Sequence, residues 1–278
     1  MGHRIGLIAG RGEITCRAVE EARRLGYRIA VAGIKGEAPK ELKKKADEFR
    51  WIEFGRLKQV VDFFKESGIN QVIMAGKINH NIIYQENIYW DETALKLLKK
   101  VKEKTPATLL KTLISYFLSQ GIEFKDIAFL MEKYFPKEGV FTADKPSSVI
   151  MENIEFGWEI AKKIAFLDIG QTVVVKDKAV VAVEGMEGTD ETVLRASKLA
   201  GPGTIVVKVS RPAQDMRFDV PVVGLSTVKR ICQVKGKALC IEAEKTIFLD
   251  QEESIALANK NKVSIVVKKG SSRFEEGI

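Results

Sequence analysis

Residues 4–10 read RIGLIAG, residues 28–34 read RIAVAGI, and residues 71–76 read QVIMAG. Each run is short and almost continuously apolar, which is typical of a strand buried on both faces of a parallel sheet. Amphipathic stretches of helical period separate the runs, at residues 13–25 and 57–68. Because strands alternate with helices, the sequence predicts an α/β fold with a parallel sheet and helices on its faces.

The chain is long enough for about two domains. We predict a Rossmann-like domain with a parallel sheet at residues 1–134, a linker at 135–146, and a second α/β domain at 147–278, built as a mixed α/β layer structure. The linker is placed where Pro and Gly interrupt the periodicity. The first domain is expected to carry a helical appendix, with helices near residues 90–104, 106–120 and 123–135.

The charge is unevenly distributed over the 278 residues. Lys and Arg number 45 against 37 Asp and Glu, which gives a net charge of +8. The first 140 residues hold 25 basic and 18 acidic side chains, and the remainder hold 20 and 19. A basic surplus attracts phosphate-bearing ligands, nucleic acid or an anionic membrane, and does not by itself choose among them. Solvated surface lysines remain the plain alternative.

The three cysteines, Cys16, Cys232 and Cys240, form no C-x-x-C pair, and their odd number argues against a disulfide framework. Such cysteine usage is typical of a reducing cytoplasm. The apolar N-terminal run is one strand long and ends in glycines, unlike a secretory signal, and no run approaches the length of a membrane-spanning helix. We therefore expect any membrane contact to be peripheral.

The first apolar run ends at Gly10 and Gly12, just before a helix. Such a turn directs backbone N–H groups at a phosphate, although it also serves simply to pack a strand closely against a helix. The G-x-G-x-x-G fingerprint is incomplete because Thr15 stands at its third glycine, which argues against a nicotinamide enzyme. After the fourth strand, Lys77 and Asn79 are candidate phosphate contacts, with a solvated lysine as the alternative for Lys77.

Carboxylates gather in two stretches of the second domain. Residues 167–171 read LDIGQ and contain Asp168 and Gln171, and residues 184–190 read EGMEGTD and contain Glu187 and Asp190. The second stretch precedes a helix, so capping by Thr189 or Asp190, or attraction to the helix dipole, is the alternative to a functional role.

Residues 208–224 read KVSRPAQDMRFDVPVVG. If this segment is extended, Asp215, Arg217 and Asp219 lie on one face, because side chains alternate along a strand. The side chains of Asp215, Arg217 and Asp219 then point together and form part of a functional site. The alternative is an edge strand with an ion trio on its surface, which contributes little to stability.

Carboxylates without His or Cys ligands suit a hard cation such as Mg²⁺ or Mn²⁺. Lys208, Arg211 and Arg217 are suited to stabilising the charge that develops during phosphate chemistry.

Six segments carry a family resemblance: GLIAGRG, MAGKI, LDIGQTVVV, AVEGMEGTD, VKVSRPAQDMRFDVPVVG and ALCIEAEKTIFLD. In this order and spacing the chain resembles the UDP-2,3-diacylglucosamine pyrophosphatases of lipid A biosynthesis, of the two-domain type unrelated to calcineurin-like phosphoesterases. The resemblance implies a cytoplasmic, Mg²⁺-dependent hydrolase that yields UMP and 2,3-diacylglucosamine 1-phosphate (lipid X).

The resemblance also implies roles for single residues, and it implies Asp168, Glu187, Asp190 and Asp219 as the metal ligands. Asp219, in the segment R-F-D-V-P, is the expected essential acid, with Asp215 and Arg217 as further catalytic residues. The expected substrate-binding residues are Gly10, Gly12, Lys77, Asn79, Gln171, Thr189, Lys208, Arg211 and Gln214. The expected partners are the UDP-lipid substrate and the inner-membrane surface, with no nucleic acid, and homo-oligomerisation stays open. The alternative is a non-catalytic nucleotide- or phosphate-binding regulatory protein on the same fold.

Overall fold

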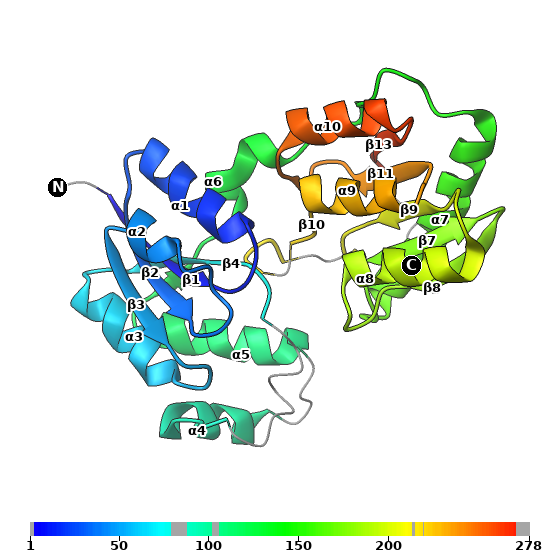
Figure 1. Ribbon diagram of the computed structural model, residues 1–278. Coiled ribbons are helices and arrows are strands. Elements are labelled where there is room, and N and C mark those ends of the chain that lie inside the picture. The colour runs from blue at the N-terminus through cyan, green and yellow to red at the C-terminus, as the bar shows by residue number, and fades with distance from the viewer. Residues whose placement is uncertain (1–2, 79–87, 102–105, 213–214, 219, 271–278) are drawn as a thin grey trace. The chain divides into compact units, whose positions relative to one another are not determined.

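The computed structural model describes residues 3–78, 88–101, 106–212, 215–218 and 220–270. The chain forms two compact units, drawn in Figure 1. Unit 1 comprises Met1–Glu132 together with Met216–Asp219, and unit 2 comprises Lys133–Asp215 together with Val220–Ile278. A short segment from the second half of the sequence therefore belongs to the first unit.

Unit 1 is built on a five-stranded sheet in the order β3-β2-β1-β4-β5, with every neighbouring pair parallel. The strands are β1 (Arg4–Ala9), β2 (Arg28–Ile34), β3 (Glu48–Ile52), β4 (Gln71–Ala75) and β5 (Glu123–Phe124). The helices are α1 (Ile14–Arg24), α2 (Leu42–Lys45), α3 (Leu57–Glu66), α4 (Glu92–Lys100), α5 (Pro106–Ser119) and α6 (Ala128–Met131), and the 3-10 helix Glu132–Tyr134 spans the boundary with unit 2 in the sequence. This order is that of doubly wound sheets, and the predicted parallel sheet is confirmed.

The apolar pattern of the first strands explains their place in the centre of this sheet. Every residue of β1 and β2 after the first is buried, as expected for strands covered on both faces. One core of unit 1 includes Phe64 of α3, Phe117 of α5 and Phe124 of β5, and also Phe218 from the distant segment. Unit 1 therefore completes its core with a side chain from far along the sequence.

The expected helix at residues 123–135 is only partly present. Its first residues form β5, which pairs with β4 through Gln71 and Glu123 and through Val72 and Phe124. Helix α6 begins at Ala128 instead. A strand of two residues is too short to display the alternation that identifies strands in a sequence, so the prediction of an all-helical appendix is wrong at this point.

Unit 2 contains a six-stranded mixed sheet in the order β6-β13-β11-β9-β7-β8, and a two-stranded sheet of β10 and β12. The strands are β6 (Gly139–Val140), β7 (Thr172–Lys176), β8 (Ala179–Val183), β9 (Ile205–Lys208), β10 (Val222–Val223), β11 (Ala238–Glu242), β12 (Ile247–Phe248) and β13 (Ser264–Lys268). The helices are α7 (Ser148–Phe166), α8 (Thr189–Ala200), α9 (Leu225–Gln233) and α10 (Gln251–Lys260). Strands β9, β11 and β13 are parallel, and β6, β7 and β8 run antiparallel to their neighbours. The predicted mixed layer structure is confirmed.

Residues 135–146, expected as a linker, contribute an edge strand to the sheet of unit 2. Val140 of β6 pairs with Val266 of β13, and the N–H of Phe141 donates to the carbonyl oxygen of Ile265 at 2.9 Å. The unit begins at Lys133, before the expected linker. Pro and Gly interrupt helical periodicity here without excluding a short edge strand.

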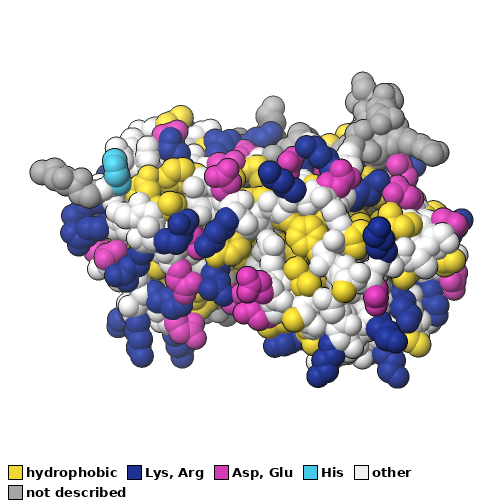
Figure 2. Space-filling model, turned by 90° about the horizontal axis from the view of Figure 1, so that it is seen from above, with side chains coloured by type: hydrophobic (Ala, Val, Ile, Leu, Met, Phe, Trp, Pro, Cys, Tyr) yellow, Lys and Arg dark blue, Asp and Glu magenta, His cyan; other side chains and the backbone are white. Residues whose placement is uncertain are grey.

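Charged side chains of both signs cover the face seen in Figure 2, with Asp and Glu standing among Lys and Arg rather than apart from them. Within the described ranges, no helix is both long enough and apolar enough to cross a membrane.

Candidate functional site

The carboxyl end of β9 carries a buried polar cluster centred on Lys208, whose side chain is 3% exposed. Its Nζ donates to Oγ1 of Thr189 at 2.7 Å and to Oγ1 of Thr172 at 3.3 Å, and lies 3.6 Å from Oε2 of Glu184. The hydroxyl of Thr189 in turn donates to Oε1 of Glu184 at 3.0 Å. Lys208 is thus held by two hydroxyls and one carboxylate, as a buried ammonium requires.

The sheet register explains why these residues meet. Thr172, the first residue of β7, pairs with Lys208, the last residue of β9, because the two strands are antiparallel. Gln171 precedes Thr172, and its carbonyl oxygen accepts the N–H of Val209 at 2.9 Å. The sequence-predicted residues Gln171, Thr189 and Lys208 are therefore brought to one edge of the sheet.

Helix α8 begins beside this cluster with Gly188 as its N-cap, at a φ of 85°. Thr189 and Asp190 lie inside the helix, so the prediction that either caps it is wrong. Asp190 accepts a hydrogen bond from the hydroxyl of Thr227 at 3.3 Å. A glycine takes the cap position because a positive φ is open to it at little cost.

Glu187 is engaged in an ion pair rather than directed at a shared site. Its Oε1 lies 2.6 Å from Nη2 of Arg195, and its Oε2 accepts the N–H of Gly185 at 3.0 Å. Burial acts to raise the pKa of Glu187, but the hydrogen bonds from Arg195 and from backbone N–H groups outweigh it and hold the pKa below its usual value.

Asp168 and Arg211, two further predicted site residues, contact each other. Nε of Arg211 lies 2.6 Å from Oδ1 of Asp168, and both side chains are about one-third exposed. Asp168 follows α7 with a φ of 56°, in the left-handed region that Asp tolerates better than most residues. The pair joins the LDIGQ segment to the start of the loop after β9.

A second buried network, which the sequence analysis missed, lies at the neighbouring strand end. Nζ of Lys162 on α7 is 3.1 Å from Oε1 of Glu242 at the end of β11, and their side chains are 0% and 3% exposed. Oε2 of Glu242 accepts the N–H and the hydroxyl of Ser210 at 2.7 and 2.8 Å. This ion pair therefore fixes the start of the loop that carries Arg211. The only signal in the sequence is a lysine on the apolar face of a long helix.

The segment 215–219 differs from its prediction. Met216 and Arg217 lie in a turn and Phe218 in a bend, so the expected extended strand with alternating faces is wrong in the part that the structure describes. Asp215 and Arg217 are half-buried, whereas Phe218 is buried. The reason is the apolar side chain of Phe218, which joins the core of unit 1. Gln214 and Asp219 lie outside the described residues.

The glycine turn of unit 1 uses its backbone N–H groups internally. The N–H of Gly10 donates to the carbonyl oxygen of Ala75 at 2.9 Å, and Arg11 and Lys77 exchange two backbone hydrogen bonds of 2.7 and 2.9 Å. A Cβ on Gly10 would lie 2.6 Å from the carbonyl oxygen of Lys77. The expectation of a free N–H is wrong for Gly10, which serves close packing instead. Gly12 and Lys77 stay predictions as phosphate contacts, and Asn79 lies outside the described residues.

Three of the four predicted metal ligands have side-chain partners in the structure. Asp168 and Glu187 pair with arginines, Asp190 accepts from Thr227, and the described part of the chain contains no group of three or more Asp, Glu, His or Cys suited to a metal ion. A metal site at these residues stays a prediction, and the fourth predicted ligand, Asp219, lies outside the described residues.

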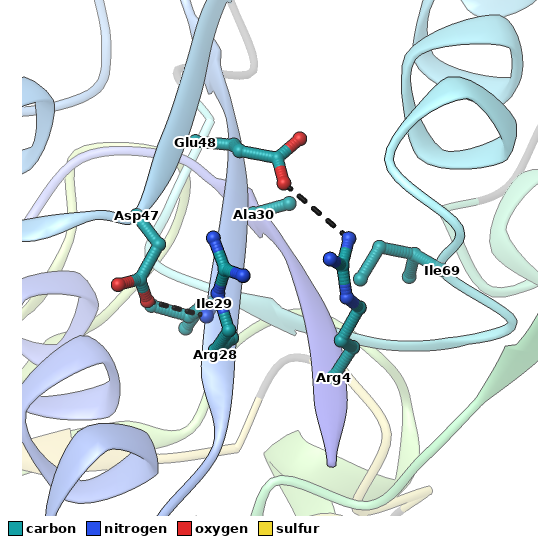
Figure 3. Close-up of a pocket in the computed structure, with 7 residues that line it drawn as sticks. All are labelled: Arg4, Arg28, Ile29, Ala30, Asp47, Glu48 and Ile69. Atoms are coloured by element: carbon teal, nitrogen blue, oxygen red, sulfur yellow. Dashed lines mark hydrogen bonds and ion pairs between the residues drawn. The ribbon is translucent and has the colours of Figure 1, made fainter. Parts of the chain in front are cut away.

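A recess at the opposite edge of the first sheet is shown in Figure 3. It lies at the amino ends of the strands, where Arg4 donates to the carbonyl oxygen of Ser67 at 2.7 Å and pairs with Glu48 at 3.5 Å. Asp47 accepts the N–H of Ile29 at 2.8 Å. These contacts join β1, β2 and β3, so the recess has a structural role.

Comparison with known proteins matches residues 4–134 to the LpxI N-terminal domain and residues 137–266 to the LpxI C-terminal domain. The UDP-2,3-diacylglucosamine pyrophosphatase LpxI of Caulobacter vibrioides is 26% identical over 268 residues, covering 92% of this chain and 94% of that protein. The match therefore extends through both units.

Solved structures resemble the chain only loosely. The biotin carboxylase subunit of pyruvate carboxylase has 15% identity and a TM-score of 0.29, covering 72% of this chain and 43% of that one. The biotin carboxylase domain of Hydrogenobacter thermophilus 2-oxoglutarate carboxylase has 17% identity and a TM-score of 0.25, covering 71% and 42%. The chain spans less than half the length of these structures, and such scores support no inference. The two domain matches, in contrast, cover nearly the whole chain in order, and the chain belongs to the LpxI family.

Proposed function

We propose that this chain hydrolyses the pyrophosphate bond of UDP-2,3-diacylglucosamine, releasing UMP and 2,3-diacylglucosamine 1-phosphate. Membership of the LpxI family makes the chain a hydrolase of a phosphoric anhydride, since the curated relative is a UDP-2,3-diacylglucosamine pyrophosphatase. The place of the reaction in lipid A biosynthesis follows from the same relationship.

The observation that carries the proposal is the meeting of three family segments around Lys208. The segment 167–171 ends at β7, the segment 184–190 leads into α8, and Lys208 ends β9. Lys208 contacts residues next to or within both other segments. A pyrophosphate is a polyanion, and the ammonium of Lys208 places a positive charge at this strand edge.

In the reaction a water oxygen attacks one phosphorus, the bridging P–O bond breaks, and both products leave as phosphate monoesters. The attacking water must lose a proton, and we assign its acceptance to the carboxylate of Asp219. Lys208 and Arg211 stabilise the negative charge that develops on the phosphate oxygens. Asp215 and Arg217 are assigned supporting roles next to Asp219.

Mg²⁺ dependence is part of the proposal through the family resemblance. The described residues contain no group of three or more Asp, Glu, His or Cys suited to the ion, and no step is assigned to it. We expect excess chelator to abolish UMP release and added Mg²⁺ to restore it. Equal turnover with and without chelator contradicts the metal requirement and leaves hydrolysis itself unaffected.

A cytoplasmic location with peripheral attachment to the inner membrane is proposed from the substrate, whose acyl chains reside in a bilayer. Exposed charges are screened within about 10 Å at 0.1 M salt, so attachment to anionic vesicles should weaken as salt is raised. Binding that is indifferent to salt removes the electrostatic part of this proposal. Homo-oligomerisation remains a prediction, to be checked by light scattering.

The central test measures UMP release from UDP-2,3-diacylglucosamine. Asp219→Ala is expected to lose UMP release by at least about 100-fold, the scale of general base catalysis, while its circular dichroism stays unchanged. Asp62→Asn on α3, an exposed carboxylate paired with Lys58, is the matched control and should retain activity. Undiminished release by folded Asp219→Ala refutes the role of Asp219. A wild-type protein that binds the substrate without turnover is the non-catalytic regulator instead.

A further inference from the structure

Unit 1 contains a cleft of about 890 Å³ at the carboxyl edge of β2 and β3. Its walls come from the residues after β2, from the short helix α2 and the segment before it, and from the end of β3 with the loop that follows. Clefts of this volume hold small molecules, and the carboxyl edge is where open α/β sheets bind ligands. Nothing in the proposed hydrolytic machinery uses this cleft.

The cleft is strongly basic. Four cationic side chains and a single carboxylate, Glu53, contribute to its wall, the cations being Lys35, Lys40, Lys43 and Arg56. Glu53 pairs with Lys35 at 3.1 Å, so it offsets one of the four charges. A concave surface lined by one sign of charge concentrates ligands of the opposite sign. These four cations are part of the basic surplus in the first half of the sequence.

An aromatic ring also contributes to the wall. Trp51 of β3 is half-buried and packs edge-on against Phe49, with ring centroids 4.7 Å apart. Gly33 of β2 makes this packing possible, because a Cβ there would lie 2.7 Å from Cζ of Phe49 and 3.2 Å from Cζ3 of Trp51. The indole is therefore fixed in place before any ligand arrives.

Arg56 is oriented in a similar way. Its guanidinium carbon lies 3.8 Å from the centroid of the Tyr89 ring, a cation–π contact that limits the freedom of the side chain. A preoriented cation loses less conformational entropy when it binds an anion than a freely rotating one. The cleft thus combines a fixed ring, an oriented guanidinium and several lysines.

We propose that this cleft binds a nucleoside phosphate, with the base against Trp51 and the phosphate among Lys40, Lys43 and Arg56. An indole stacks on a planar base, and cations bind its phosphate. A lipid headgroup carries phosphate without a planar ring and leaves Trp51 unused. The glycine turn at β1, in contrast, employs the N–H groups of Gly10 and Arg11 internally. The choice of a uridine nucleotide as ligand rests on the proposed function.

The test titrates the full-length protein with UMP and follows binding by calorimetry. Lys40→Gln with Lys43→Gln removes two exposed cations of the cleft, and Lys198→Gln with Lys229→Gln removes two exposed cations of unit 2 as a control of equal net charge. We expect the Kd for UMP to rise about tenfold or more in the cleft variant and to stay within about twofold in the control. Uridine, which lacks phosphate, should bind weakly to all three proteins.

Three results overturn the inference: no UMP binding by the wild-type protein, equal weakening in both double variants, or loss of binding to phosphatidylglycerol vesicles in the cleft variant while UMP affinity is unchanged. The last result identifies the cleft as a membrane contact.

Hydrolysis is assayed separately on the same proteins. UMP binding that depends on the cleft in a protein without turnover supports the inference and contradicts the proposed function. If the protein hydrolyses the substrate but the cleft variant binds UMP as tightly as the wild-type protein, the result supports the proposed function and contradicts the inference.

Discussion

The backbone N–H of Ile127 donates to the carbonyl oxygen of Met216 at 3.3 Å, and so joins the segment before α6 to a turn from the second half of the sequence. Two residues further on, Phe218 is 9% exposed within a core of unit 1. The segment R-F-D-V-P is thus anchored to the parallel-sheet unit by its own aromatic residue. Asp219 follows that anchor directly.

Truncation of the anchor should destabilise unit 1. Phe218→Ala removes a buried ring and leaves a cavity, which costs about 3 to 5 kcal/mol for a core phenylalanine. We expect a lower urea midpoint for unit 1 and, because Phe218 adjoins Asp219 in the sequence, a loss of hydrolysis greater than the unfolded fraction explains. Phe218→Leu keeps most of the apolar volume and should recover much of both properties. A midpoint unchanged in Phe218→Ala contradicts the anchoring role.

The buried pair of Lys162 and Glu242 should respond asymmetrically to substitution. Lys162→Met leaves a buried carboxylate whose other cation, Lys245, is 3.4 Å away and about half exposed, and breaking a buried pair costs about 3 to 5 kcal/mol. Adding Glu242→Gln removes the charge but keeps an oxygen acceptor for Ser210. The double variant should therefore be more stable than Lys162→Met alone. Chemical denaturation measures the unfolding free energy of both variants. If the second substitution only adds a further loss of stability, the result argues against the ion pair.

The ion pair of Glu187 and Arg195 should give a pH-dependent contribution to stability. The pKa of Glu187 is lowered in the folded protein, so the contribution is fully present above the ordinary glutamate pKa of about 4.3 and is lost as the pH falls through the lower folded value. Because both side chains are at least one-third exposed, its size should stay below about 1 kcal/mol.

The pH prediction is checked by comparing Glu187→Gln with the wild-type protein at pH 7 and below pH 4. The difference in unfolding free energy should shrink on acidification. The same comparison made in an Arg195→Gln background should show little pH dependence, because the partner is absent. A difference that persists at low pH, or that survives without Arg195, is evidence against the ion pair as its source.

Thiol reactivity should separate the three cysteines. Cys240 is 0% exposed, and burial raises its pKa far above the usual range, whereas Cys16 and Cys232 are half-buried with pKa values raised mainly by burial. Only the thiolate reacts with iodoacetamide. Native protein should therefore be modified slowly at Cys16 and Cys232 and at Cys240 only after unfolding. Peptide mass spectrometry reads the order, and early labelling of Cys240 contradicts its burial.

Sequence periodicity predicted the parallel sheet of unit 1 because β1, β2 and β4 are apolar after their first residue and are flanked by amphipathic helices. It missed β5 and β6, since two-residue strands carry no period and are defined by their partners. Lys208 and Thr189 are predicted site residues from their segments, and the structure brings them within 2.7 Å of each other. The pairing of Lys162 with Glu242 could not, because it depends on which strand ends meet in space. The placement of Phe218 in unit 1 likewise follows from tertiary packing and leaves no local pattern.

The return of Met216–Asp219 to unit 1 has a consequence for biosynthesis. Chains fold from the N-terminus as they leave the ribosome, yet the core of unit 1 lacks Phe218 until most of the second half has been translated. The core of unit 1 is therefore incomplete while the first part of unit 2 is being translated. A nascent chain arrested before residue 218 should be digested by protease within residues 1–132, and one arrested well beyond it should resist.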